Sequence, residues 1–461
     1  MIVFGVFIFA LGACVGSFLN VVIWRLPNWG REVIYQNVRG RLTLSWPASH
    51  CPKCDAPIRW YQNIPVLAWL ALRGRCANCR KPIAVRYPLV ELGTACLFLG
   101  FFLADFVAHW QPGFINPHVD WPAFALQLVM VAALLAASAI DADLFFIPLS
   151  IPYFLLILAL AATPFIDQPT IFRLSTAAGS WWLTKPVLGA IAGLLVAIAL
   201  MALHLLPRSF STEPSSGVES AERDVPTDLP LDSGAVPTAT ETAEDMLSGP
   251  PMLTRFRPSL ITASVLVLVG IAVWFIAPGA PASLADVLIG IALFLLGVLP
   301  RDADQVDVTD EVMDEISAPH VRREVAKELV FLAFPIAGAV IAYFLPWQLP
   351  EQAWLGRLLG ALLGALSGGA IVWFVRVGGT FAFNKEAMGM GDAHLLLGIG
   401  AILGAPLVIV AFFIAPFIGL MWAIVLLLMK KPNVLPYGPW LSVGAILSLL
   451  VGYPLLRILL G

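Results

Sequence analysis

The chain has 461 residues, of which 59% are hydrophobic and 12% are charged, with a formal net charge of −3. Soluble domains usually contain about 25% charged residues, and an ordinary buried core does not absorb so much apolar sequence. The composition therefore excludes a soluble globular protein. It predicts an all-α polytopic membrane protein with about eleven transmembrane segments.

The first apolar run covers residues 1–24, with no basic region before it and no cleavage-site pattern after it. We interpret it as a retained first transmembrane helix rather than a removed signal peptide. In residues 25–87, eleven Lys and Arg stand against two acids, Glu32 and Asp55. Because positive charge concentrates in cytoplasmic loops, we expect residues 25–87 to form a small cytoplasmic domain.

This segment contains two cysteine pairs, "CPKC" and "CANC", separated by 21 residues. Each Cys-x2-Cys turn directs two sulfurs at one point, and four thiolates complete a closed tetrahedral zinc site. Two disulfides are the alternative, but cytoplasmic thiols stay reduced. The spacing therefore predicts a structural zinc ion, which would stabilise the small domain. Its predicted ligands are Cys51, Cys54, Cys76 and Cys79.

Three regions follow along the chain. Residues 88–206 form a predicted membrane region that contains two acids, Asp141 and Asp143, at the end of an apolar run. Residues 207–257 are rich in Ser, Thr, Pro and acids, a composition typical of a disordered cytoplasmic linker. Residues 258–327 are predicted to contain two further transmembrane segments and a polar cytoplasmic segment.

The last region, residues 328–461, is a second predicted membrane region. It carries the sequence "GMGD", which ends at Asp392. The apolar block that follows, 393–429, is too long for one span. We expect it to break at Gly404-Ala405-Pro406, because a proline interrupts the helical hydrogen bonds.

Acids at the edges of membrane spans are costly and usually functional, which directs attention to Asp141 and Asp392. Two carboxylates in one partly dry site share a proton. The charged carboxylate can then act as a base towards water while the other donates to a carbonyl. This is the chemistry of an aspartic protease. A transporter that uses the same acids as a proton relay is one alternative, and acids that only solvate or cap helix ends are another.

Five blocks of sequence carry a resemblance to a known family. They are "GACVGSFLNVVIWRLP" (12–27), the stretch 51–95 that begins "CPKCDAPIRWYQNIP", "AIDADLFFIP" (139–148), "GMGDAHLLLGIGAILG" (389–404) and "LPYGPWLSVGA" (435–445). In this order they resemble the bacterial type IV prepilin peptidases, which are membrane aspartic proteases of the GxGD type.

The resemblance implies an endopeptidase that removes leader peptides from type IV prepilins and pseudopilins at the cytoplasmic face of the bacterial inner membrane. It also implies N-methylation of the new N-terminus with S-adenosylmethionine, and a peptidase without methyltransferase activity is the alternative. The partners would be these substrates and membrane lipid, with no nucleic acid. The resemblance assigns catalysis to Asp141 and Asp392, with Asp143 as the fallback for the first position.

Residues elsewhere in these blocks are expected to bind the substrate or the methyl donor: Gly16, Asn20, Arg25, Gly74, Glu91, Gly389 and Gly391. For Arg25 a positive-inside anchor is the alternative role, and for Gly16 and Gly74 a packing or turn role. The chain departs from the family's pattern by its insertion at 207–327 and by a histidine, His394, where relatives commonly carry lysine.

Overall fold

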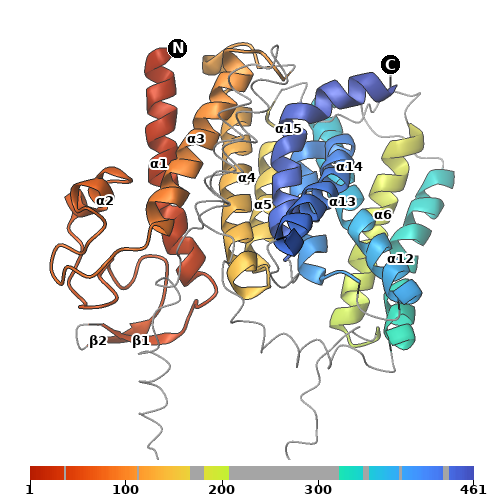
Figure 1. Cartoon of the computed structure of the whole chain (residues 1–461). Coiled ribbons are helices and arrows are strands. Elements are labelled where there is room, and N and C mark those ends of the chain that lie inside the picture. The colour runs from red at the N-terminus through yellow and green to blue at the C-terminus, as the bar shows by residue number, and fades with distance from the viewer. Residues whose placement is uncertain are drawn as a thin grey trace, which may run out of the picture.

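The computed structural model describes residues 1–35, 38–111, 114–166, 181–206, 321–345, 352–383, 387–428 and 436–460. Long helices make up most of this part of the chain (Figure 1). They are α1 (Ile2–Arg25), α3 (Arg86–Phe106), α4 (Pro117–Leu144), α6 (Trp181–Ala202), α12 (Val321–Phe344), α13 (Ala353–Phe383), α14 (Met390–Leu428) and α15 (Gly438–Leu460). The predicted all-α fold class is confirmed.

Eight of the described helices are long and apolar enough to cross a membrane, so the protein is a multi-pass membrane protein. Within the predicted membrane region 88–206, the apolar run 148–165 would suggest a span, but α5 (Ser150–Ala162) has only 13 residues where a span needs about 20. This helix ends at Ala162, two residues before Pro164, which has no backbone N–H to continue the helical hydrogen bonds. The predicted linker 207–257 and the transmembrane pair within 258–327 lie outside the described residues.

The helices are arranged from α1 and α3 at one side, through α4 and α5, to α13, α14 and α15, with α6 and α12 at the far side (Figure 1). The most apolar stretch of α4 is 83% buried inside the protein, whereas that of α1 is 22% buried. Helix α4 is therefore central, and α1 leaves most of its surface for lipid. This placement matters because the predicted acids lie at the C-terminal end of α4.

Glycines bring two pairs of helices into close contact. A Cβ at Gly12 would lie 2.7 Å from Cα of Ala95, and one at Gly16 would lie 2.7 Å from Cα of Glu91, so α1 packs directly on the backbone of α3. Gly193 of α6 meets the carbonyl of Phe334 in α12 in the same way. Such small-residue spacing is typical of helix packing in membranes. Gly16, a predicted binding residue, thus has a packing role.

The chain reverses direction inside α14, at Gly404. This glycine has φ 77° and ψ 168°, outside helical geometry. Gly368 of α13 contacts both Leu396 and Val408, which would be about 18 Å apart along a continuous helix. The two halves of α14 therefore lie side by side, and the predicted break of the block 393–429 is confirmed. The reversal returns the chain to the end where Asp392 lies.

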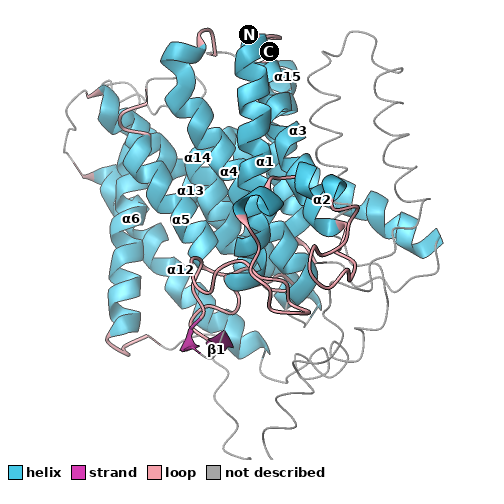
Figure 2. Cartoon of the chain, turned by 90° about the vertical axis from the view of Figure 1, so that its left-hand side faces the viewer, coloured by secondary structure: helices cyan, strands magenta, loops and turns pink. Residues whose placement is uncertain are grey.

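A small domain connects α1 to α3. Its elements are β1 (Glu32–Tyr35), β2 (Val38–Arg41), η1 (Trp60–Asn63) and α2 (Leu67–Ala71), and the two strands pair antiparallel. Figure 2 shows its loops, with β1 and α2 labelled, at one end of α1. We call it the four-cysteine domain, because it contains both cysteine pairs.

Candidate active site and metal centre

The two cysteine pairs lie in two loops of the same design, residues 51–58 and 76–83. Both loops have the sequence pattern Cys-x2-Cys-x2-Pro-Ile. In each loop the first cysteine donates its backbone N–H to the carbonyl five residues later, at 3.0 Å for Cys51 and 2.9 Å for Cys76. An isolated β-bridge closes each loop. The fold therefore contains a local repeat that presents two thiols from each copy, and the sequence analysis missed it.

The four sulfurs meet at one place. Cys51, Cys54, Cys76 and Cys79 offer Sγ atoms that all lie within 4.8 Å of one another. The Sγ atoms of Cys51 and Cys79 are 3.9 Å apart. Zn–S bonds of about 2.3 Å in a tetrahedron imply sulfur separations of about 3.8 Å. All four cysteines are free thiols rather than disulfides. The donor set and its spacing fit a structural Zn²⁺ ion.

The local hydrogen bonds favour thiolates at two of these positions. The backbone N–H of Ala56 and the side-chain amide of Asn78 lower the pKa of Cys54 to about 6. The backbone N–H of Cys79 lowers the pKa of Cys76. Burial raises the pKa of Cys51 to about 12 when no cation is present. A bound cation would displace the Cys51 proton, so metal binding at this site would release protons.

Arg25 joins the four-cysteine domain to α1. Its guanidinium donates to the carbonyls of Thr43 and Leu44, both at 3.1 Å, and to that of Pro47 at 2.7 Å. Arg25 is only 6% exposed. Its donors are thus committed to three backbone carbonyls, which is a structural anchor for the domain.

Two other predicted binding residues, Asn20 and Glu91, make contacts at the same junction. Asn20 donates to the carbonyl of Tyr87 at 3.2 Å. Glu91 accepts a hydrogen bond of 2.6 Å from the backbone N–H of Val66. Val66 has φ 60°, which is unusual for a β-branched residue and costs free energy. Glu91 therefore holds a strained connection between α3 and the four-cysteine domain.

Gly74, predicted from the same blocks, lies inside the four-cysteine domain. It has φ +65°, and a Cβ there would lie 2.8 Å from the ring of Trp69. A glycine is needed for both reasons, because only glycine adopts this backbone conformation freely and only glycine leaves room for the indole. The structure thus gives Gly74 a turn and packing role.

Asp141 and Asp143 lie two residues apart on α4 but have different partners. Asp141, which is 6% exposed, accepts a hydrogen bond of 2.9 Å from the backbone N–H of Gly438 at the start of α15. Asp143 forms an ion pair of 2.6 Å with Arg86 at the start of α3. The chain enters α3 from the four-cysteine domain, so the Arg86–Asp143 pair places these acids at the domain's end of the helices.

Asp392 reaches the same place from α14. It is 9% exposed, and the charge of the Asp141 carboxylate acts on it. A Cβ at Gly391 would lie 3.4 Å from Cβ of Ile147, and one at Gly389 would lie 3.5 Å from Oδ2 of Asp392. The two glycines of "GMGD" therefore let the loop lie against Ile147 and the carboxylate.

Two residues of this site were missed as individuals in the sequence analysis, although both lie in the block 435–445. Gly438 supplies the N–H to Asp141, and a Cβ there would lie 2.6 Å from Oδ2 of Asp141. Burial raises the pKa of Tyr437, and the nearby Asp392 carboxylate raises it further, so the phenol stays protonated. Nothing in a single sequence marks the backbone N–H of a glycine, or one tyrosine among others, as part of a site with two carboxylates. Only the block itself pointed to this segment.

This arrangement has a definite chemical capacity. Two buried carboxylates whose charges interact cannot both ionise without a cost, so such a pair can share one proton. A charged carboxylate can take a proton from water while its protonated partner donates to a carbonyl oxygen. Fold and site together define a polytopic membrane protein with a cysteine-rich domain and a carboxylate pair at one end of its helices.

Comparison with known proteins finds one matching segment in each half of the chain. Residues 10–104 match the Bacterial Peptidase A24 N-terminal domain, and residues 321–424 match the Type IV leader peptidase family. Both matches agree with the resemblance inferred from the sequence, which is confirmed as a resemblance. No solved structure matches the chain.

Curated relatives agree with these matches. A type 4 prepilin-like proteins leader peptide-processing enzyme of Escherichia coli O78:H11 is 45% identical over 139 residues, 29% of this chain and 46% of that protein. Prepilin leader peptidase/N-methyltransferases of Myxococcus xanthus and Neisseria gonorrhoeae are 45% and 38% identical, over 32% and 42% of this chain. The matches span 36% and 64% of those two proteins, so this chain covers less than two thirds of each relative.

Proposed function

We propose that this protein is a membrane-embedded aspartic endopeptidase that cleaves leader peptides from type IV prepilins and pseudopilins. Asp141 and Asp392 would be its catalytic pair. The observation that carries the proposal is that the segments holding these two acids, 251 residues apart in the sequence, pack together. Gly391 lies against Ile147, and Ile147 lies beside Gly438, which donates to Asp141. Asp143 is less suited, because its carboxylate is paired with Arg86.

In this mechanism the ionised carboxylate of the pair takes a proton from water, and the water oxygen attacks the scissile carbonyl carbon. The protonated carboxyl donates to the carbonyl oxygen, which gives a neutral tetrahedral diol. Collapse of the diol breaks the C–N bond while the leaving amine takes up a proton. The N–H of Gly438 orients Asp141 for these steps, since it fixes one carboxylate oxygen.

The charge pattern supports a cytoplasmic site. The segment 25–87 holds eleven Lys and Arg, and it is joined to the same end of the helices as the carboxylate pair. We therefore place the four-cysteine domain and the site at the cytoplasmic face of the bacterial inner membrane. The substrates would be membrane-bound prepilins and pseudopilins, approached through lipid, with no part for nucleic acid.

We also propose a structural zinc ion in the four-cysteine domain and N-methylation of the cleaved product. S-adenosylmethionine would supply the methyl group when bound. Arg25, Asn20 and Glu91 make intramolecular hydrogen bonds, so their part would be to shape the junction between this domain and the membrane helices. A proton-coupled transporter is a weaker proposal, because it has no need of the four-cysteine domain.

Co-expression with a candidate prepilin, followed by intact-mass analysis, tests this proposal. We expect loss of the leader from the substrate, together with the added mass of one methylene group at the new N-terminus. Cleavage without that added mass would leave a peptidase alone. An uncleaved prepilin in the presence of correctly inserted protein would contradict the proposed function.

Gly438→Ala should lower the turnover of cleavage by about 100-fold, because a displacement of about 1 Å at a catalytic group has an effect of this size. The new Cβ would lie 2.6 Å from Oδ2 of Asp141, so the carboxylate must move. Gly378→Ala is the matched control, since a Cβ there meets nothing within 4 Å. Cleavage kinetics of both variants measure the difference. Equal activity of the two would show that Gly438 does not orient Asp141.

Deleting residues 209–252 should leave cleavage intact. This stretch has nine acids, one base and a composition that cannot build a core, and it contains none of the family blocks. The measurement is processing of a co-expressed prepilin by the deletion variant at matched membrane levels. Complete loss of processing by an inserted deletion variant would show that the stretch does more than connect.

A further inference from the structure

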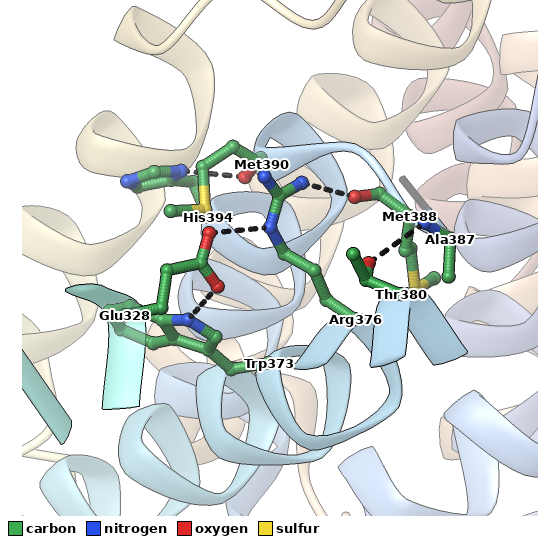
Figure 3. A network of polar contacts seen from close by, with 8 residues as sticks. All are labelled: Glu328, Trp373, Arg376, Thr380, Ala387, Met388, Met390 and His394. Atoms are coloured by element: carbon green, nitrogen blue, oxygen red, sulfur yellow. Dashed lines mark hydrogen bonds and ion pairs between the residues drawn. The ribbon is translucent and has the colours of Figure 1, made fainter. Parts of the chain in front are cut away.

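The loop that carries "GMGD" is held by side chains that lie outside the carboxylate pair. Arg376 of α13 donates through Nη1 to the carbonyl of Met388. Thr380, one turn further along α13, accepts a hydrogen bond of 3.1 Å from the N–H of Ala387. Both contacts precede Asp392 by only a few residues (Figure 3). The loop is thus attached to the last turns of α13 at two points.

Arg376 is itself held by a buried partner. Its Nε lies 3.1 Å from Oε1 of Glu328 on α12, and the other carboxylate oxygen of Glu328 accepts a hydrogen bond of 2.9 Å from Nε1 of Trp373. Arg376 is 3% exposed and Glu328 is 2% exposed. Figure 3 shows the three side chains between α12 and α13, with Arg376 extended towards Met388. Such a pair is costly to bury, and it gives a single well-defined geometry.

His394 completes the attachment from the other side. Its Nδ1 lies 2.7 Å from the carbonyl of Met390, which can only accept, so Nδ1 carries the proton. The ring of Tyr153 on α5 packs edge-on against the imidazole, at 5.6 Å between centroids. The histidine therefore contacts the start of α14 and α5.

We infer that Arg376, held by Glu328 and Trp373, is a positioning residue that fixes the loop 387–391 and thereby aligns Asp392 with Asp141. This inference rests on the proposed function. Arg376 acts on the loop through the carbonyl of Met388. Its guanidinium contacts both Glu328 and Met388, and a lysine, with a single nitrogen, cannot reproduce that geometry.

Kinetics of prepilin cleavage form the first test, with Arg376→Lys and the double variant Glu328→Gln/Arg376→Gln. The double variant removes both charges, so it leaves no buried charge unpaired. We expect kcat to fall by about 10- to 100-fold in both, with KM changed less than about threefold, because a displaced Asp392 affects the reacting geometry more than substrate binding. Trp373→Phe removes only one donor to Glu328 and should have a smaller effect in the same direction.

The matched control is Arg357→Lys. Arg357 lies on the same helix, is 9% exposed and donates through Nε and Nη2 to the carbonyl of Pro164, at 3.1 and 2.7 Å. It is about 28 Å from Arg376 along the helix. Its substitution should leave kcat unchanged. An equal loss of kcat in Arg357→Lys, or full kcat in the double variant, would overturn the inference.

A second measurement needs no peptidase activity. A Cβ at Gly391 would lie 3.4 Å from Cβ of Ile147, close to the separation of about 3.8 Å in disulfides. Ile147→Cys with Gly391→Cys should therefore cross-link readily, as detected by mass spectrometry of the linked peptides. We expect Arg376→Lys to slow this cross-link by about 10-fold and Arg357→Lys to leave it unchanged. An unchanged rate in Arg376→Lys would overturn loop positioning, even if the proposed function itself failed.

Discussion

Asp392→Asn and Asp141→Asn should each reduce prepilin cleavage by about 1,000-fold or more, while the protein stays inserted in the membrane. Asparagine keeps the shape of the side chain but can neither share the proton nor act as a base. Because the two acids act as one unit, the double variant should be hardly less active than either single variant. Processing of a co-expressed prepilin at matched protein levels measures the effect.

Asp143→Asn is the discriminating comparison. The Asp143 carboxylate contacts Arg86 rather than the pair, so we expect this variant to retain cleavage within about tenfold of the parent. Its main defect should be a lower melting temperature, since Arg86 loses its partner. Full activity of Asp141→Asn together with loss in Asp143→Asn would transfer the catalytic role to Asp143.

Cys51→Ser and Cys76→Ser should each remove most of the zinc from the purified protein, because a structural site loses its closed tetrahedron with any one ligand. The four-cysteine domain should then become sensitive to proteolysis, with methylation reduced more than cleavage. Elemental analysis and limited proteolysis are the measurements. We expect about one zinc ion per chain in the parent protein.

Cys14→Ser provides the matched control. Cys14 lies on α1, outside the tetrad, and is exposed on the helix surface. Its substitution should leave metal content and protease resistance unchanged. The absence of zinc from parent protein that was purified without chelators would contradict the metal site, as would equal metal content in Cys51→Ser and Cys14→Ser.

The four-cysteine cluster and the break in α14 were both predictable because their signals are local. A Cys-x2-Cys turn directs two sulfurs towards one point through its own backbone, so the tetrad follows from two short motifs. The reversal in α14 follows from a glycine two residues before a proline, each of which breaks helical geometry in a known way. The membrane class likewise follows from composition alone.

The length of α5 and the roles of the junction residues were not predictable in the same way. The apolar run 148–165 looks long enough to span, yet the structure ends its helix before Pro164. The sequence was compatible with two roles for Arg25, ligand binding and a positive-inside anchor. It does not indicate which carbonyls Arg25 contacts. Those carbonyls belong to a loop whose path depends on the fold of the whole four-cysteine domain.

The sequence by itself determined the membrane class, the four-cysteine cluster and the three acids from which the proposed pair is drawn. Only the tertiary structure separated Asp141 from Asp143, because positions two residues apart on α4 differ by about 200° around the helix and therefore meet different neighbours. The roles of Gly438 and Arg376 also required the structure. Gly438 donates its own backbone N–H to Asp141, and Arg376 donates to the backbone carbonyl of Met388. Contacts between distant segments depend on how the helices pack, and a single sequence does not record that packing.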